Sequence, residues 1–149
     1  MGTCESIDCL DILLVEDNPA DVELTRIALN EGKLLHTLHV AYDGVEAMEY
    51  LRRTGRHTGA ARPDIILLDL NLPRKDGRDV LDEIKSSDEL KVIPVIVLTS
   101  SPSEEDVLRS YRLHANSYIC KPVDLENFIR VICSLENYWI SIVKLPPKE

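Results

Sequence analysis

The chain has 149 residues, of which 44% are hydrophobic and 29% are charged, and its formal net charge is −9. This length fits one domain with a substantial core, and the negative charge argues against non-specific binding to nucleic acid. No apolar run approaches the roughly 20 residues of a membrane span, and the N-terminus lacks the regions of a secretory signal. Four cysteines without a CxxC pair favour a reducing compartment, so we expect a cytoplasmic protein.

Short apolar runs alternate with helical patterns along the chain. Strands are predicted at residues 10–15, 35–40, 64–69, 94–98 and 117–120. Five helices are predicted after these strands, with apolar faces formed by Ala20, Leu24, Ile27 and Ala28; by Val45, Met48 and Leu51; by Val80, Leu81 and Ile84; by Val107, Leu108 and Tyr111; and by Leu125, Phe128, Ile129 and Ile132. This alternation predicts an α/β fold with a parallel sheet that is covered on both faces.

Local signals mark where these helices begin. Asn18 before Pro19 is typical of a helix start, Ser101–Glu104 reads as a capping box, and Asp124 is a cap for the last helix. The basic, glycine-bearing segment 52–63 is predicted to be an exposed loop.

Polar residues stand where the predicted strands end. Glu16 and Asp17 follow the first strand, and Asp69 ends the third. Thr99 follows the fourth strand, and Lys121 follows the fifth. Because ligands bind at the carboxyl ends of strands in open parallel sheets, we expect these five side chains to converge on one rim.

Three carboxylates at one rim need a positive counterpart, because like charges resist being brought together. Lys121 supplies one charge, and a hard divalent cation would supply two more. Oxygen ligands without a histidine cluster favour Mg²⁺, or Mn²⁺, over zinc. Such a site accommodates phosphate oxygens, so the pattern predicts phosphoryl chemistry with Asp69 as nucleophile, while Lys121 and Thr99 hold phosphate oxygens.

Four segments, VEDN (15–18), LLDLNLPRKDG (67–77), VLTSS (97–101) and YICKP (118–122), resemble the receiver domain of two-component response regulators. The resemblance implies a flavodoxin-like (βα)5 doubly wound parallel sheet with strand order 2-1-3-4-5. It assigns residues 10–136 to the receiver, 1–9 to an N-terminal tail and 137–149 to a C-terminal extension.

The same resemblance implies a metal site and a phosphoacceptor. Asp69 would take a phosphoryl group from a sensor histidine kinase. Glu16, Asp17 and Asp69 would hold Mg²⁺ together with the main-chain carbonyl of Asn71. The domain would be a phosphoacceptor that catalyses its own phosphotransfer and a slow autodephosphorylation, and not an enzyme that acts on a separate substrate.

The remaining motif residues correspond to the switch and the phosphate grip of the family. Thr99 and Tyr118 match the switch pair, in which the hydroxyl engages the phosphate and the aromatic ring reorients. Lys121 matches the phosphate-binding lysine, and the Lys121–Pro122 bond is usually cis in such domains. Gly77 matches the loop glycine.

A narrower resemblance covers nearly the whole chain. RPDIILLDLNLPRKDGRDVL (62–81), the 52–63 loop and the ending NYWISIVKLPP (137–147) are similar to the small regulators paired with cyanobacterial and bacterial phytochrome histidine kinases. It implies a stand-alone regulator with a downstream protein target and no nucleic-acid or membrane partner. The terminal Trp139, Ile142 and Val143 indicate a homodimer contact, with folding of this segment onto its own domain as the alternative.

Other interpretations of the rim remain open. A strand-end aspartate is often only a turn former or helix cap. Phosphatases of the haloacid dehalogenase type also use a strand-end aspartate, but they need a second aspartate two residues later, where this chain has Asn71. A pseudo-receiver that serves only as an interaction module is the third alternative, and failure to bind Mg²⁺ would favour it.

Overall fold

Five parallel strands form a single sheet in the computed structural model, which describes residues 9–31, 35–111 and 113–134. The strands are β1 (Leu10–Val15), β2 (His36–Ala41), β3 (Ile65–Asp69), β4 (Val95–Thr99) and β5 (Ser117–Cys120). They lie in the order β2-β1-β3-β4-β5, and every neighbouring pair is parallel. This is the 2-1-3-4-5 order implied by the sequence resemblance, which is therefore confirmed.

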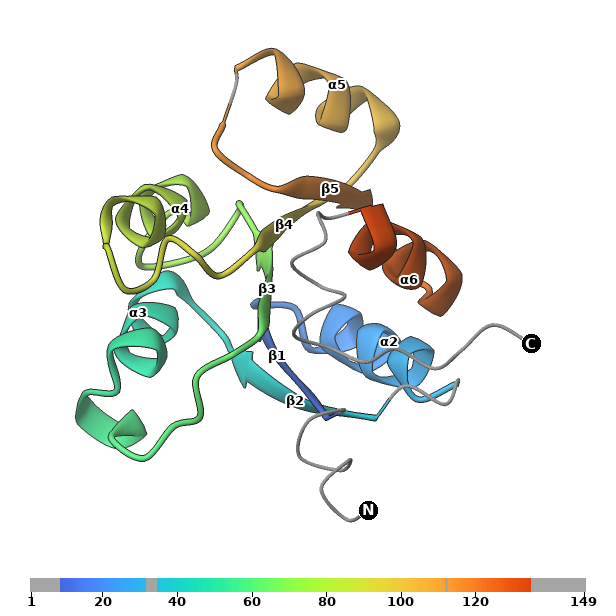
Figure 1. Ribbon diagram of the computed structural model, residues 1–149. Helices are drawn as coiled ribbons and strands as arrows, with labels where there is room; N and C mark the ends of the chain where they lie inside the picture. The colour runs from blue at the N-terminus through green and yellow to red at the C-terminus, as the bar shows by residue number, and fades with distance from the viewer. Residues whose placement is uncertain (1–8, 32–34, 112, 135–149) are drawn as a thin grey trace.

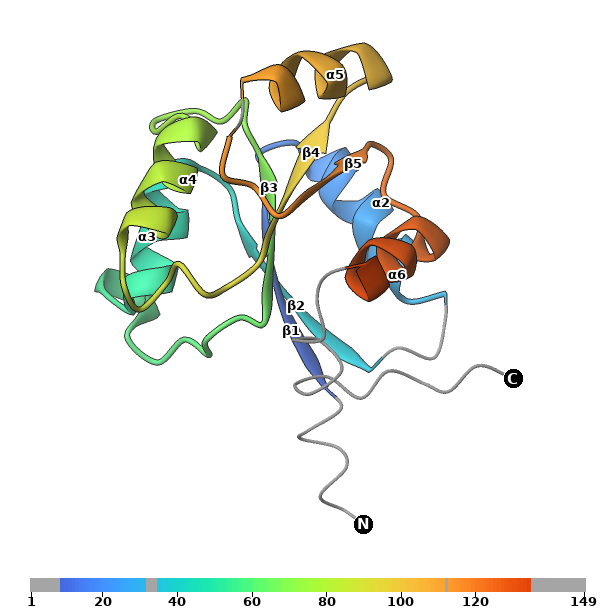
Figure 2. The same cartoon turned by 45° about the horizontal axis from the view of Figure 1, so that its top comes forward.

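Helices cover both faces of the sheet (Figure 1). They are α2 (Pro19–Leu29), α3 (Gly44–Arg52), α4 (Gly77–Ser86), α5 (Pro102–Ser110) and α6 (Leu125–Ser134), with a short 3₁₀ helix, η1 (Gly55–His57), in the predicted 52–63 loop. Figure 2 shows α3 and α4 on one side of the sheet and α2 and α6 on the other. None of the helices in the described part of the chain has the length and apolarity needed to span a bilayer.

The central strands are buried on both faces because their side chains point alternately to the two helical layers. In β3, Ile66 and Leu68 pack in the cluster that contains the inner residues of α3 and α4. Ile65 and Leu67 point the other way and pack with residues of α2 and α6. A strand held this way is fixed in register, so the residue at its end has a defined position on the rim.

The predicted apolar face of α2 is mostly wrong, since only Ala28 of its four residues is buried. The residues that the helix buries are Val22, Thr25, Ala28 and Leu29. Leu24 and Ile27 are instead about half exposed, at 50% and 51%, and Ala20 is exposed. Because this helix carries apolar residues on two overlapping faces, their spacing alone does not fix which face packs against the sheet.

The predicted face of α5 is also mostly wrong. Only Leu108 is buried, whereas Val107 and Tyr111 are 51% and 64% exposed. This helix lies beside β5 at the edge of the sheet (Figure 1), where there is less surface to cover than over the central strands. Its outer apolar residues therefore stay in contact with solvent.

Candidate functional site

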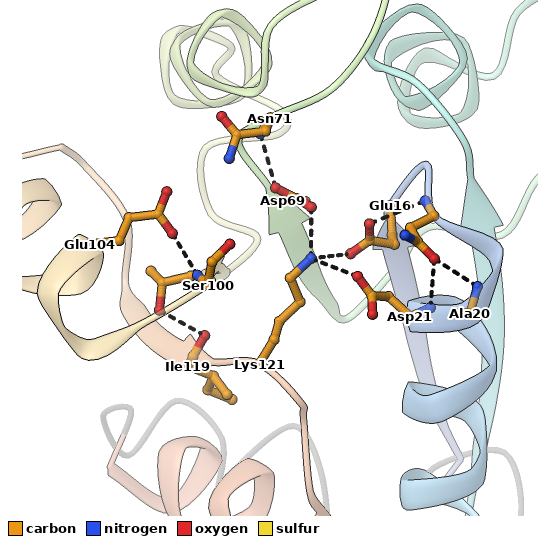
Figure 3. Close-up of polar contacts among 11 residues, drawn as sticks. Glu16, Ala20, Asp21, Asp69, Asn71, Ser100, Glu104, Ile119 and Lys121 are labelled. Atoms are coloured by element: carbon orange, nitrogen blue, oxygen red, sulfur yellow. Dashed lines mark hydrogen bonds and ion pairs between the residues drawn. The ribbon is translucent and has the colours of Figure 1, made fainter.

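The polar residues at the strand ends converge on one rim of the sheet. Glu16 follows β1, Asp69 ends β3, Thr99 ends β4 and Lys121 follows β5. Glu16, Asp69 and Thr99 are 1%, 6% and 0% exposed. Figure 3 shows that Glu16, Asp69 and Lys121 point toward one another from three separate elements. The convergence expected from the parallel sheet is therefore present for Glu16, Asp69 and Lys121.

Lys121 is the centre of this cluster. Its ammonium nitrogen, Nζ, donates to Glu16 Oε1, Asp21 Oδ2 and Asp69 Oδ2, at 3.0 Å each. An ammonium group has three N–H donors, so these three carboxylates use all of them. Burial alone lowers the pKa of Lys121, but the hydrogen bonds to the three carboxylates outweigh it and hold the pKa above its ordinary value. Lys121 is therefore positively charged throughout the physiological range.

Glu16 is the most deeply buried acid of the rim. Burial raises the pKa of its carboxyl group to about 7, and the negative charge of Asp69 adds to the shift. The hydrogen bond from Lys121 opposes that rise, as does the N–H of Asn18, which donates to Oε2 at 3.2 Å. Near neutral pH, Glu16 is thus close to the midpoint of its titration.

The carboxylates form a group that suits a hard cation. Oxygen atoms of Glu16, Asp17 and Asp69 all lie within 4.8 Å of one another. Asp17 is exposed, so the group opens to solvent on one side. Three carboxylates without histidine or cysteine are the donors that Mg²⁺ and Mn²⁺ prefer. The donor set therefore fits the predicted metal, with Glu16, Asp17 and Asp69 as the residues that would hold it.

Main-chain groups orient Asp69. The N–H of Asn71 donates to Asp69 Oδ1 at 2.9 Å, which leaves Oδ2 for Lys121 (Figure 3). The loop between β3 and α4 returns to the end of β3 at Gly77, whose N–H donates to the Leu70 carbonyl at 3.0 Å. A Cβ at position 77 would lie 2.6 Å from the carbonyl oxygen of Asp69, so glycine permits this close approach. The Lys121–Pro122 peptide bond is cis, as the resemblance implied.

Thr99 and Tyr118, the predicted switch pair, are both buried. The Thr99 hydroxyl donates to the Ile119 carbonyl at 3.5 Å, so it contacts the main chain of β5. Tyr118 is 8% exposed, and the guanidinium carbon of Arg109 lies 4.5 Å from the centre of its ring. Arg109 is in turn paired with Glu105 at 2.9 Å. The aromatic ring is thus covered by a charged pair of α5.

Sequence reasoning missed two residues of this region, Asp21 and Arg109. A signal for Asp21 was available, since an acid in the first turn of a helix that starts at the rim remains near the rim. No comparable signal pointed to Arg109, because its contact with Tyr118 depends on how α5 lies over β5.

A separate cavity of about 490 Å³ lies near the opposite ends of the strands, between the ends of α3 and α4. Its polar lining includes Arg52, Arg53 and Arg62. The Arg62 guanidinium donates to the Glu89 carbonyl at 2.8 Å, and Arg52 pairs with Glu83 at 3.6 Å. Arg52 and Arg62 thus have structural partners, and the cavity is not part of the rim cluster.

Comparisons with known proteins agree on one family. Residues 12–133 match the model of the response regulator receiver domain. The response regulator Rcp1 of Synechocystis sp. is 46% identical over 135 residues, which cover 91% of this chain and 92% of that protein.

Solved structures give the same result. The bacteriophytochrome response regulator AtBRR matches with a TM-score of 0.82 and 42% identity, over 95% of this chain and 99% of that chain. The phosphorylated cyanobacterial phytochrome response regulator RcpA has a TM-score of 0.70 and 48% identity, over 93% and 99%. The Mn²⁺-bound form of Rcp1 has a TM-score of 0.70 and 45% identity, over 93% and 99%.

Proposed function

This chain belongs to the response regulator receiver family, and we propose that Asp69 is its phosphoacceptor. The observation that carries the proposal is the position of this carboxylate. It ends a buried strand, accepts a hydrogen bond from Lys121 at 3.0 Å, and belongs to the oxygen group with Glu16 and Asp17. An acid so placed is both held in position and close to positive charge.

The reaction is the transfer of a phosphoryl group from a histidine of a sensor kinase to Asp69. An oxygen of the Asp69 carboxylate attacks phosphorus, the new P–O bond forms, and the P–N bond to the kinase breaks with its electron pair left on the histidine nitrogen. Bound Mg²⁺, when present, neutralises charge on the phosphoryl oxygens. Lys121 keeps a proton on Nζ and donates to a phosphoryl oxygen, and Thr99 turns its hydroxyl from Ile119 toward another.

The signal leaves the site through Thr99 and Tyr118. Rotation of Thr99 vacates the place where its hydroxyl meets the Ile119 carbonyl, next to Tyr118 in β5. The Tyr118 ring then changes its position under Arg109, and the surface of α5, β5 and α6 changes with it. A downstream target protein reads that surface, in line with the general behaviour of two-state switches.

The relatives support a kinase of the phytochrome type as the donor, because Rcp1-like and bacteriophytochrome regulators match over most of this chain. Slow hydrolysis of the acyl phosphate by water, which restores the Asp69 carboxylate, ends the signal. The cysteine pattern supports a cytoplasmic site of action.

The domain limits proposed from the sequence are 10–136 for the receiver and 137–149 for an extension. The N-terminal tail (1–9) and the extension fall almost wholly outside the described residues. A homodimer through the extension is proposed because Trp139, Ile142 and Val143 are apolar. Light scattering over a range of micromolar concentrations tests it, and a constant monomer mass would refute it.

The phosphoacceptor is tested by intact-mass spectrometry after incubation with acetyl phosphate and Mg²⁺. We expect one added phosphoryl group in the wild type and none in Asp69→Asn or in the presence of a chelator. Asp82→Asn makes the same chemical change at an exposed position of α4 and should behave as the wild type. A phosphoryl group that persists in Asp69→Asn would refute the assignment, and failure of the wild type to accept one would favour a pseudo-receiver.

A further inference from the structure

We propose that Asp21 is a positioning residue for Lys121: it keeps the ammonium group at the rim when a metal ion takes the oxygens of Glu16 and Asp69. The inference rests on the proposed function, since it concerns the same site. It assigns a role to a fourth carboxylate that is not part of the metal-binding oxygen group.

The contact between Asp21 and Lys121 joins elements that are far apart in the sequence. Asp21 Oδ2 accepts from Lys121 Nζ at 3.0 Å, across 100 positions of the chain. The Asp21 side chain comes from the first turn of α2 and points to Lys121 beside Glu16 (Figure 3). Its side chain is 33% exposed, against 2% for the side chain of Glu16 and 9% for that of Asp69, so it is the most solvent-accessible of the three partners.

The helix start fixes where Asp21 lies. Asn18 caps α2, and its Oδ1 accepts from the N–H groups of Ala20 at 2.8 Å and Asp21 at 3.1 Å. These bonds hold the main chain of Asp21 in place, close enough for its short side chain to reach Lys121. A simpler interpretation is that Asp21 only stabilises the positive end of α2. That interpretation predicts an effect on folding stability and no effect that depends on Lys121.

The metal and Lys121 compete for the same carboxylates. In the structure Lys121 bonds to Glu16 Oε1 and Asp69 Oδ2, and both residues belong to the oxygen group that suits a cation. A cation that binds there draws on the negative charge of the same two carboxylates, and this weakens their bonds to Lys121. When those bonds weaken, Lys121 keeps its hydrogen bond to Asp21. This matters because an ammonium group without partners would be unfavourable at this partly buried position.

Among the described residues, loss of Asp21 leaves Lys121 with the carboxylates of Glu16 and Asp69, which are also those that suit the metal. Asp21→Asn should therefore weaken metal binding, by about fivefold in Kd if the coupling has the size usual for contacting charged residues. Loss of one negative charge near the site acts in the same direction. The two causes differ in that only the first requires Lys121.

A double-mutant cycle separates these causes. The Kd for Mn²⁺ is measured by calorimetry for the wild type, Asp21→Asn, Lys121→Met and the double variant. We expect the effect of Asp21→Asn to fall below about twofold when Lys121 is absent. Glu23→Gln removes the same charge from an exposed position of α2 and should leave Kd unchanged.

A second readout distinguishes positioning from direct chemistry. The Mg²⁺ concentration that half-saturates phosphorylation by acetyl phosphate should rise in Asp21→Asn, while the rate at saturating Mg²⁺ stays near that of the wild type. Asp21→Glu keeps the charge and should restore most of the affinity. If Asp21→Asn folds poorly, Asp21→Ala takes its place in the same cycle, because alanine is favourable in a helix.

The possible results distinguish a failure of the Asp21 role from a failure of the proposed function. If the wild type binds Mn²⁺ and accepts a phosphoryl group but Asp21→Asn binds Mn²⁺ equally well, the role of Asp21 is refuted and the proposed function stands. An equal loss of affinity with and without Lys121 also refutes it, since the effect is then one of charge alone. If the wild type neither binds the metal nor accepts a phosphoryl group, both inferences fall together.

Discussion

The titration of Glu16 should make Mg²⁺ binding depend on pH in the neutral range. Glu16 is 1% exposed, and burial together with the charge of Asp69 raises its pKa to about 7 in the metal-free protein. Only the ionised carboxylate can hold Mg²⁺, so a proton must leave before or during binding. The metal therefore competes with a proton at this residue.

The size of the effect follows from the pKa. The apparent Kd is the intrinsic Kd multiplied by one plus the ratio of protonated to ionised Glu16. A change from pH 8 to pH 6 should thus raise the apparent Kd about tenfold, and binding near pH 7 should release about half a proton per ion.

Calorimetry in buffers with different heats of protonation measures both quantities in one set of experiments. Glu16→Gln, which has no carboxyl group to titrate, should bind the metal more weakly and lose most of the pH dependence. An apparent Kd that stays constant from pH 6 to pH 8 in the wild type would refute the reasoning, because it would mean that Glu16 is ionised throughout.

Folding stability should respond to the same titration with the opposite sign. A carboxyl group whose pKa is raised in the folded state stabilises the fold fully below its ordinary pKa, and this contribution is lost as the pH rises through the folded-state pKa of about 7. The metal-free protein should become less stable between about pH 5 and pH 8, by at most about 3 kcal/mol. Thermal unfolding with a chelator measures it, and saturating Mg²⁺ should remove the loss.

Three further substitutions test the packing around the site. Gly77→Ala would place a Cβ 2.6 Å from the carbonyl oxygen of Asp69, so we expect a loss of about 1–3 kcal/mol in the free energy of unfolding. Gly59→Ala is the control: a Cβ there meets nothing within 4 Å, and the substitution should have little effect. Phe128→Ala should cost about 3–5 kcal/mol in denaturant unfolding because this ring is wholly buried, and a cost below 1 kcal/mol would contradict its place in the core. Burial raises the pKa of Tyr118 and the charge of Arg109 lowers it, so Arg109→Ala should raise this pKa further. NMR titration of the Tyr118 ring measures the change, and an unchanged titration would refute the contact.

The parts of the site that the sequence predicts are those that depend on topology alone. The limits of β1 and β5 agree with the predicted runs, and the other three strands begin and end within one residue of prediction. Once five strands are parallel, the residues after them share a rim whatever the details of packing. For that reason the sequence alone predicts that Glu16, Asp69 and Lys121 lie together.

The parts that the sequence does not predict depend on how each helix is rotated and where it lies. Leu24 and Ile27 look like core residues by spacing, yet both are about half exposed. The same rotation of α2 directs Asp21 to the rim. The ion pair between Asp21 and Lys121 thus follows from packing, and no spacing rule relates two residues 100 positions apart.

The charges of the rim suggest why one small domain can respond to both a metal and a phosphoryl group. Lys121 pairs with Glu16, Asp21 and Asp69, and the exposed carboxylate of Asp17 lies beside those of Glu16 and Asp69. In the metal-free state the excess negative charge of these carboxylates is balanced partly by Lys121 and partly by protonation of Glu16. On the proposed mechanism, a divalent cation held by Glu16, Asp17 and Asp69 would replace those protons and would free Lys121 from two partners. Phosphorylation would then add negative charge where the lysine had become available, so each step would prepare the electrostatic conditions for the next.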